Sequence, residues 1–217
     1  MRNDLPELLA QCLMRTTYRI DIDGTIALPR FYHEDLQECA NWYVREGIVK
    51  SEEIASLQFH QQLFLLPHVL ITHQAIEGAV QALQELNTQG KTLQYFTVRQ
   101  NFNPVICEQV HRNTSIWLEQ QHFPCPMDVH FFWNQAEKLL ASLEAQEEKV
   151  LLIDDRPNNL IKAYTEIAQN DLDKAQQIRQ RVTVVAFGCA DTDSLDRSGL
   201  RVVPLMDWST FYQLTFS

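Results

Sequence analysis

Two short acidic segments contain the residues of this sequence that are best suited to do chemistry. Asp21 and Asp23 lie in Asp-Ile-Asp-Gly-Thr, at the end of an apolar, β-prone stretch that begins at Tyr18. Asp154 and Asp155 directly follow the apolar run at 150–153. A carboxylate can act as a nucleophile, as a general acid or base, or as a ligand for a hard cation. Four carboxylates at one place would repel one another and raise their own pKa values, so such a cluster predicts a neutralising cation.

Magnesium is the cation that these residues favour. The five cysteines form no Cys-x-x-Cys pair, and His68, His73 and His130 show no ligand spacing, so we assign no catalytic role to these histidines. An oxygen-only ligand set is typical of Mg²⁺, which uses few carboxylates, keeps several waters and takes an oxygen from a substrate phosphate. The acidic residues therefore predict a magnesium site that handles a phosphate.

The elements that must position these carboxylates alternate between strand and helix. Apolar β-prone runs at 93–97, 129–132, 150–153, 182–187 and 200–203 are separated by amphipathic or capped helical segments. This alternation predicts an α/β fold with a mostly parallel sheet, helices on both faces and right-handed crossovers. Sites in such sheets form outside the carboxyl ends of the strands. The predicted strand ends carry Asp21, Asp23, Thr97, Asp154 and Asp155.

One stretch departs from this alternation. Between positions 29 and 71 the pattern is helical without a convincing strand, and Ser51 is a plausible helix N-cap. We expect an α/β core made of 1–28 and 72–217, with 29–71 inserted as a small helical cap. The aromatic residues of the insertion could stack on a base, but their helical spacing is more typical of the cap's own core.

The acidic segments resemble the motifs of the haloacid dehalogenase (HAD) superfamily. Asp21-Ile-Asp-Gly-Thr25 resembles the first motif, Asp-x-Asp-Gly-Thr, and Leu151-Leu-Ile-Asp-Asp155 resembles the acidic pair of the fourth. Thr97 corresponds to the second motif, and Lys138 lies upstream of the fourth. The resemblance covers roughly 18–26 and 76–187, and it implies a HAD-like Rossmannoid sheet with an α-helical cap. The cap position and fourth motif are also similar to those of 5′(3′)-deoxyribonucleotidases, although the separation of Lys138 and Asp154 is longer than in that group.

The resemblance implies a role for each catalytic residue. Asp21 would be the nucleophile that carries the phosphoryl group, and Asp23 the general acid and base, for which a pKa nearer neutrality would be suitable. Lys138 would neutralise the charge on the nucleophile and the phosphoryl group, with Lys149 and Lys162 as alternatives.

The resemblance also implies the residues that bind phosphate and metal. Gly24 would permit a turn that brings backbone amides, including that of Thr25, to the phosphate, and the Thr97 hydroxyl would donate to it. Arg99 would either reach the substrate phosphate or lie exposed at a helix entry. Magnesium would be bound by Asp21, Asp154 and the backbone carbonyl of Asp23, with Asp155 acting through water or a hydrogen bond.

The predicted function is a magnesium-dependent phosphomonoester hydrolase that acts on a small phosphorylated metabolite, with a nucleotide as one candidate. A phosphotransferase built from the same residues and a noncatalytic partner protein on the same fold are the alternatives. The second aspartate of the first motif argues against dehalogenation. With 28 acidic and 18 basic residues the net charge is -10, which argues against binding to a nucleic-acid polymer. The segment 1–16 resembles neither a signal peptide nor a membrane span, so a cytoplasmic location is expected.

Overall fold

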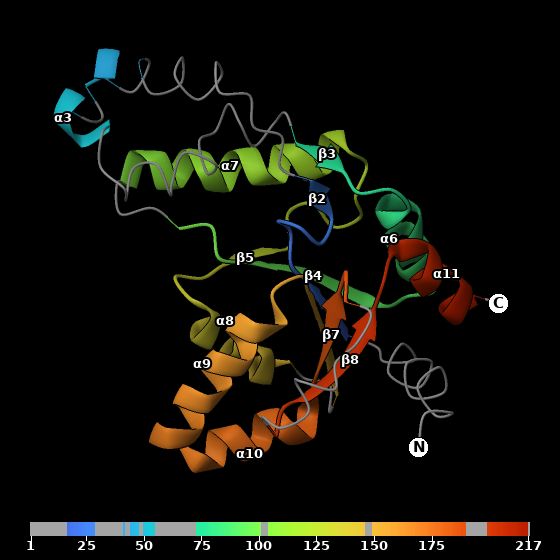
Figure 1. The fold of residues 1–217 in the computed structure, drawn as a ribbon. Helices are drawn as coiled ribbons and strands as arrows, with labels where there is room; N and C mark the ends of the chain where they lie inside the picture. Colours follow the sequence, from blue (N-terminus) through green and yellow to red (C-terminus); the bar gives the residue numbers. More distant parts are fainter. Residues whose placement is uncertain are drawn as a thin grey trace.

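The main sheet of this protein is parallel throughout. The computed structural model describes residues 17–28, 41, 44–47, 50–54, 73–100, 104–145, 149–189 and 199–216. The six strands of the main sheet are paired in the order β5-β4-β1-β6-β7-β8. Their bounds are β1 (Thr17–Ile20), β4 (Thr92–Thr97), β5 (Val129–Phe131), β6 (Val150–Asp154), β7 (Val182–Phe187) and β8 (Arg201–Leu205). Because β1 lies between β4 and β6, the acidic segments that follow β1 and end β6 are neighbours (Figure 1).

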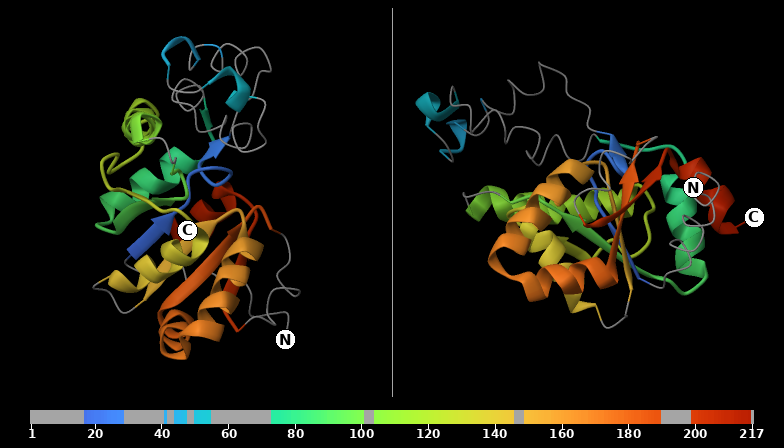
Figure 2. Two further views of the ribbon diagram at one scale, coloured as in Figure 1. Left: turned by 90° about the vertical axis from the view of Figure 1, so that its left-hand side faces the viewer. Right: turned by 60° about the horizontal axis from the view of Figure 1, so that its bottom comes forward.

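Helices cover both faces of this sheet. Helices α6 (Ala79–Thr88) and α11 (Trp208–Phe216) pack on one face together with residues of α7 (Pro104–Gln120). Helices α8 (Gln135–Ala141), α9 (Pro157–Asn170) and α10 (Leu172–Arg181) pack on the other (Figures 1 and 2). Alternate residues of one strand face opposite clusters: Leu151 and Ile153 face α6 and α11, while Leu152 faces α9 and α10. Burial on both faces explains the continuous apolar strands and confirms the predicted fold class.

A two-stranded ribbon marks the place where the inserted segment joins the core. Strand β2 (Ala27–Leu28) pairs antiparallel with β3 (Gln74–Ala75), and Leu28 is opposite Gln74. The inserted segment therefore leaves and re-enters the core at adjacent positions. Two-residue strands have no readable periodicity, and this ribbon was not predicted from the sequence.

Helix α3 (Ser51–Ile54) begins at the predicted cap residue Ser51. The rest of the expected cap, including its aromatic residues and His68, lies largely outside the described residues, as does the N-terminal segment 1–16. The helical cap and the domain division thus remain predictions. Within the described part of the chain, no helix is long and apolar enough to span a membrane.

Candidate active site

The loop after β1 positions the first acidic segment. The carbonyl of Ile22 accepts hydrogen bonds from the amides of Thr25, Ile26 and Ala27 at 3.3, 3.0 and 2.9 Å, so the chain turns at Ile22, two residues after β1 ends. The amide of Asp21 still donates to the carbonyl of Ile153 in β6 at 2.8 Å. Asp21 is therefore tied to the neighbouring strand, while the residues that follow it form a compact turn.

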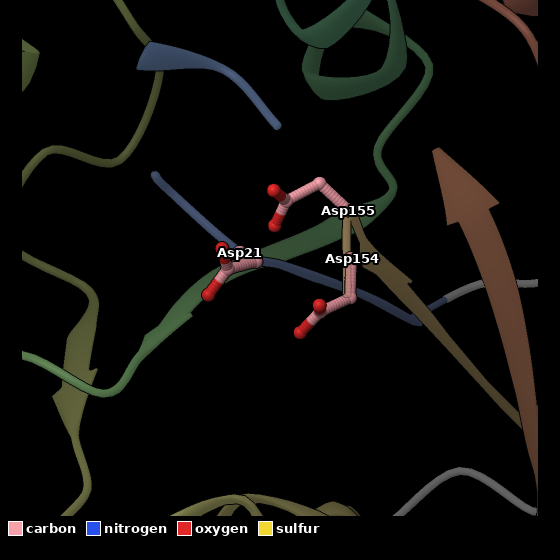
Figure 3. A group of neighbouring side chains, drawn as sticks. All are labelled: Asp21, Asp154 and Asp155. Atoms are coloured by element: carbon pink, nitrogen blue, oxygen red, sulfur yellow. The ribbon is translucent and has the colours of Figure 1, made fainter. Parts of the chain in front are cut away.

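Three carboxylates converge at the ends of β1 and β6. Asp21, Asp154 and Asp155 each offer an oxygen, and these oxygens all lie within 4.8 Å of one another (Figure 3). The convergence follows from the parallel register of β1 and β6. Ile20 is opposite Ile153, so the residues that follow them, Asp21 and Asp154, lie at the same edge of the sheet. Asp21 directly follows β1 and Asp154 ends β6, so both lie at strand ends as predicted, and the two strands are neighbours.

A buried lysine joins two of these carboxylates. The ammonium group of Lys138, in α8, donates to Asp21 Oδ1 at 2.5 Å and to Asp154 Oδ2 at 2.6 Å, and the side chain is 0% exposed. Burial opposes the charged form of Lys138, but Asp154 and Asp21 outweigh it and raise its pKa. Lys149, one of the competing lysines, instead donates to the carbonyl of Gln180. The structure thus brings Lys138 to the acidic cluster.

Two contacts place α8 so that Lys138 can reach the cluster. Asn134 caps the helix by accepting a hydrogen bond from the amide of Glu137 at 2.9 Å. At the other end, Arg19 in β1 donates to the carbonyl of Ala141 at 2.5 Å. Both ends of the helix are therefore anchored, and the second anchor comes from the strand that precedes Asp21.

The carboxylate cluster carries more negative charge than Lys138 neutralises. Burial raises the pKa of Asp21 to about 8; Lys138 opposes this effect, while Asp154 and Asp23 add to it. Burial and the charge of Asp154 likewise raise the pKa of Asp155 to about 6. A further cation among these groups would favour their ionised forms.

The donor set has the chemistry of a magnesium site. All three groups of the cluster are carboxylates, and Asp155 Oδ1 is buried without a hydrogen-bond partner among the described residues. Asp154 Oδ1 accepts the amide of Arg156 at 2.8 Å, which orients that carboxylate. The carboxylate of Asp23 is not part of the cluster, and the expected contribution of its backbone carbonyl stays a prediction.

Asp23 forms an ion pair with Arg99, a contact that was not predicted from the sequence. Arg99 Nε donates to Asp23 Oδ2 at 2.8 Å and Nη2 to Oδ1 at 2.6 Å, while Nη1 donates to Thr114 Oγ1 at 2.9 Å. Arg99 is 1% exposed, so the alternative of an exposed arginine at a helix entry is wrong. The predicted substrate-binding role of Arg99 stays a prediction, since these three bonds use three of the five guanidinium N–H groups.

This pairing also changes the acid–base expectation for Asp23. Burial would raise the pKa of Asp23, but the charge and paired hydrogen bonds of Arg99 outweigh burial, so the pKa is lowered. The expectation of a pKa nearer neutrality is therefore wrong for the protein without substrate.

Gly24 is required for a steric reason as well as for its backbone conformation. Its φ is +80°, and a Cβ at this position would lie 2.2 Å from Asp155 Oδ2. The amides of Gly24 and Thr25 donate to the carbonyls of Ala27 and Ile22, so both close the turn. The assignment of Gly24 and Thr25 to phosphate binding stays a prediction, and these two amides already have partners within the turn. Thr97 ends β4 as expected, with 1% of its surface exposed.

Two residues near Asp23 were missed by the analysis of the sequence. His73 is 2% exposed, and its Nδ1 lies 3.9 Å from Asp23 Oδ1. Burial, with the nearby charge of Arg99, lowers the pKa of His73 to about 4 despite the opposing effect of Asp23. Thr114 lies in the middle of α7. Neither residue has a motif that could have indicated its position; only the fold brings them to this edge.

Comparison with known proteins finds similarity to solved structures but not to sequence families. No known family profile matches the sequence, and no curated protein does. Among solved structures, a candidate phosphatase from Clostridium difficile has a TM-score of 0.51 at 13% identity, covering 92% of this chain and 97% of the other. A HAD-superfamily hydrolase from Ehrlichia chaffeensis has a TM-score of 0.48 at 11% identity, covering 91% and 94%. A hydrolase from Pseudomonas syringae has a TM-score of 0.49 at 16% identity, covering 94% and 100%.

Three features together define a HAD-like fold, as the motifs predicted. They are the strand order, the acidic loop after β1, and the acidic pair at the end of the neighbouring strand β6.

Proposed function

We propose that this protein is a magnesium-dependent phosphomonoester hydrolase that forms an aspartyl phosphate on Asp21. The observation that carries the proposal is the position of Asp21: one oxygen is bonded to the buried ammonium of Lys138, beside Asp154 and Asp155. An anion held between a fixed cation and a potential metal site is suited to attack phosphorus, because both positive charges can also stabilise the phosphoryl group in transit.

Two transfers complete the proposed reaction. Asp21 attacks phosphorus, the bond to the leaving oxygen breaks, and Asp23 gives its proton to that oxygen. Water then attacks the aspartyl phosphate while Asp23 takes the water's proton, which releases phosphate and restores both carboxyl groups. Asp23 must be protonated for the first transfer. A bound phosphate dianion favours this state, because a like charge nearby raises the pKa of a carboxyl group.

Asp21, Asp154 and Asp155 would hold the magnesium ion. When bound, it supplies positive charge that keeps these carboxylates ionised and attracts a phosphate oxygen. Amides of Ile22 and Asp23 are candidate phosphate donors, since neither donates in a described hydrogen bond and both follow Asp21 directly.

A hydrolysis assay with matched variants tests this proposal. The purified protein is expected to release phosphate from 4-nitrophenyl phosphate with Mg²⁺ and to lose this activity with a chelator. Asp21→Asn removes the attacking charge with little change of shape, so activity should fall by about 10³-fold or more. Single turnover quenched in acid should leave a phosphoryl group on the Asp21 carboxylate, which mass spectrometry detects, because water attacks its phosphorus only in the second transfer. Near-normal hydrolysis by Asp21→Asn would overturn the proposal.

The same site also allows a phosphotransferase, which differs only in whether an alcohol outcompetes water for the aspartyl phosphate. Adding an alcohol acceptor to the assay and measuring the transferred phosphate separates the two reactions. A noncatalytic partner protein is the third candidate, and a chain inactive on every phosphate ester tested would favour it. A small phosphorylated metabolite, including a nucleotide, is the substrate class that we propose, with a cytoplasmic location.

A further inference from the structure

A chain of hydrogen bonds links helix α7 to Asp23. Thr114 Oγ1 donates its one proton to the carbonyl of Val110 at 2.8 Å and accepts from Arg99 Nη1 at 2.9 Å. The hydroxyl therefore has a defined orientation, with a lone pair toward the guanidinium. Arg99 in turn donates through Nε and Nη2 to both carboxylate oxygens of Asp23.

This arrangement fixes the plane of the Asp23 carboxylate. Asp23 lies at the start of the turn after β1, and its side chain is 18% exposed. A paired contact from the planar guanidinium restricts both position and rotation, which a single lysine ammonium does not do. Each carboxylate oxygen has a second lone-pair position. The contact with Arg99 therefore leaves Asp23 able to exchange a proton on its other side.

We infer that Arg99 and Thr114 are positioning residues for the proton transfer by Asp23: Thr114 holds the guanidinium, and the guanidinium aims the carboxylate at the leaving oxygen. The inference rests on the proposed function, because it assigns a task to the proposed general acid. Proton transfer needs the acid within hydrogen-bond reach of the leaving oxygen, and small errors in aim are costly.

Two esters that differ only in leaving group test this role. Loss of the first proton transfer penalises an alkyl ester, whose alkoxide needs a proton, far more than 4-nitrophenyl phosphate, whose phenolate leaves without one. We would measure kcat/KM for 4-nitrophenyl phosphate and glycerol 2-phosphate with Mg²⁺, using the full chain. Inhibition by inorganic phosphate reports ground-state binding separately.

Thr114→Val is the main variant, because it removes the hydroxyl and nearly keeps the shape. We expect kcat/KM on the alkyl ester to fall by about tenfold and that on the nitrophenyl ester by less than about threefold, with phosphate inhibition retained. Thr114→Ser keeps the hydroxyl and should recover most of the loss. Thr215→Val is the matched control, since Thr215 Oγ1 donates to the carbonyl of Phe211 at 2.8 Å in α11 and has no arginine partner within the described part of the chain.

Arg99→Lys provides the second arm. This variant should show the same selective loss of kcat/KM on the alkyl ester. Combined with Asp23→Asn, it should add little to the loss that Asp23→Asn causes alone, because both changes impair the same proton transfer. Arg99→Lys alters a buried ion pair and can fold poorly; the two Thr114 variants then carry the test, with melting temperature as the check on folding.

An equal fall of kcat/KM on both esters in these variants would overturn the positioning role and would show that Arg99 and Thr114 have only a structural role. Weaker phosphate inhibition in Arg99→Lys, together with an equal fall on both esters, would instead make Arg99 a phosphate ligand. A wild-type protein that hydrolyses neither ester would overturn the proposed function, and this inference with it.

Discussion

The buried ammonium of Lys138 is the residue-level feature on which the acidic cluster depends. It is bonded to both Asp21 and Asp154, so its removal leaves two buried carboxylates without their shared partner. We expect Lys138→Met to lower the free energy of unfolding of the metal-free protein by about 3–5 kcal/mol. Added Mg²⁺ should recover part of this loss, because a cation can replace the missing charge.

Chemical denaturation with and without Mg²⁺ measures both effects. Lys149→Met is the control, since Lys149 is bonded to the carbonyl of Gln180 at an exposed position and its loss should cost less than about 1 kcal/mol. Equal destabilisation by the two variants would contradict a special role for Lys138 in the cluster.

His73 predicts a pH dependence of stability. Its pKa is about 4 in the folded chain, whereas an unfolded histidine titrates near the ordinary value of 6.5. The unfolded chain therefore binds the proton first as the pH falls, so stability contributed by neutral His73 is present above pH 6.5 and is lost as the pH falls to about 4.

Denaturation between these pH values should show a steeper loss of stability for the wild-type protein than for His73→Gln. The exposed His122→Asn serves as the control, because Asn tolerates the left-handed backbone of that position. Identical pH slopes for wild type and His73→Gln would argue against a buried neutral His73.

At the scale of elements, the loop after β1 must fit closely against the end of β6. Gly24 makes this fit possible, because any Cβ there would overlap Asp155 Oδ2. Gly24→Ala should displace Asp155, weaken Mg²⁺ binding by about tenfold or more, and lower activity correspondingly. Isothermal titration with Mg²⁺ and the hydrolysis assay give the two measurements.

Gly90→Ala separates steric overlap from backbone strain. Gly90 also has a positive φ, of +73°, but a Cβ there meets nothing within 4 Å. This variant should lose about 1 kcal/mol of stability and keep its Mg²⁺ affinity. If both glycine variants bound Mg²⁺ like wild type, the close approach of loop and acidic pair would not matter for the metal site.

At the scale of the whole molecule, the β2–β3 ribbon allows the inserted segment to be tested by removal. Leu28 and Gln74 are opposite each other, so Asn-Gly in place of 29–72 leaves a three-residue hairpin loop of Asn, Gly and His73 and keeps this register. If the insertion is a lid that selects the leaving group, this variant should keep activity on 4-nitrophenyl phosphate and lose discrimination among phosphorylated metabolites. A metabolite screen of both proteins makes the comparison, and unchanged discrimination would remove the lid from the mechanism.

The sequence by itself determined the fold class and most of the acidic site. Apolar runs such as 150–153 and 182–187 are buried on both faces, so their composition alone indicates a parallel sheet, and the acids that follow them must lie at its carboxyl edge. The motifs likewise indicated that Asp21 and Asp154 lie at strand ends. The resemblance left Lys138, Lys149 and Lys162 as alternatives, and only the structure brings Lys138 to these acids.

Only the tertiary structure decided the contacts between distant segments. The side chains around Asp23 come from three places: Arg99 after β4, His73 before β3, and Thr114 in α7, which contacts Arg99. The loop after β1 also has a contact near the end of the chain, where Trp208 Nε1 donates to the carbonyl of Thr25 at 2.8 Å. Such contacts depend on how helices pack and on which side chains reach across the sheet edge. Local periodicity contains no information about either, because it reports only which face of an element is buried.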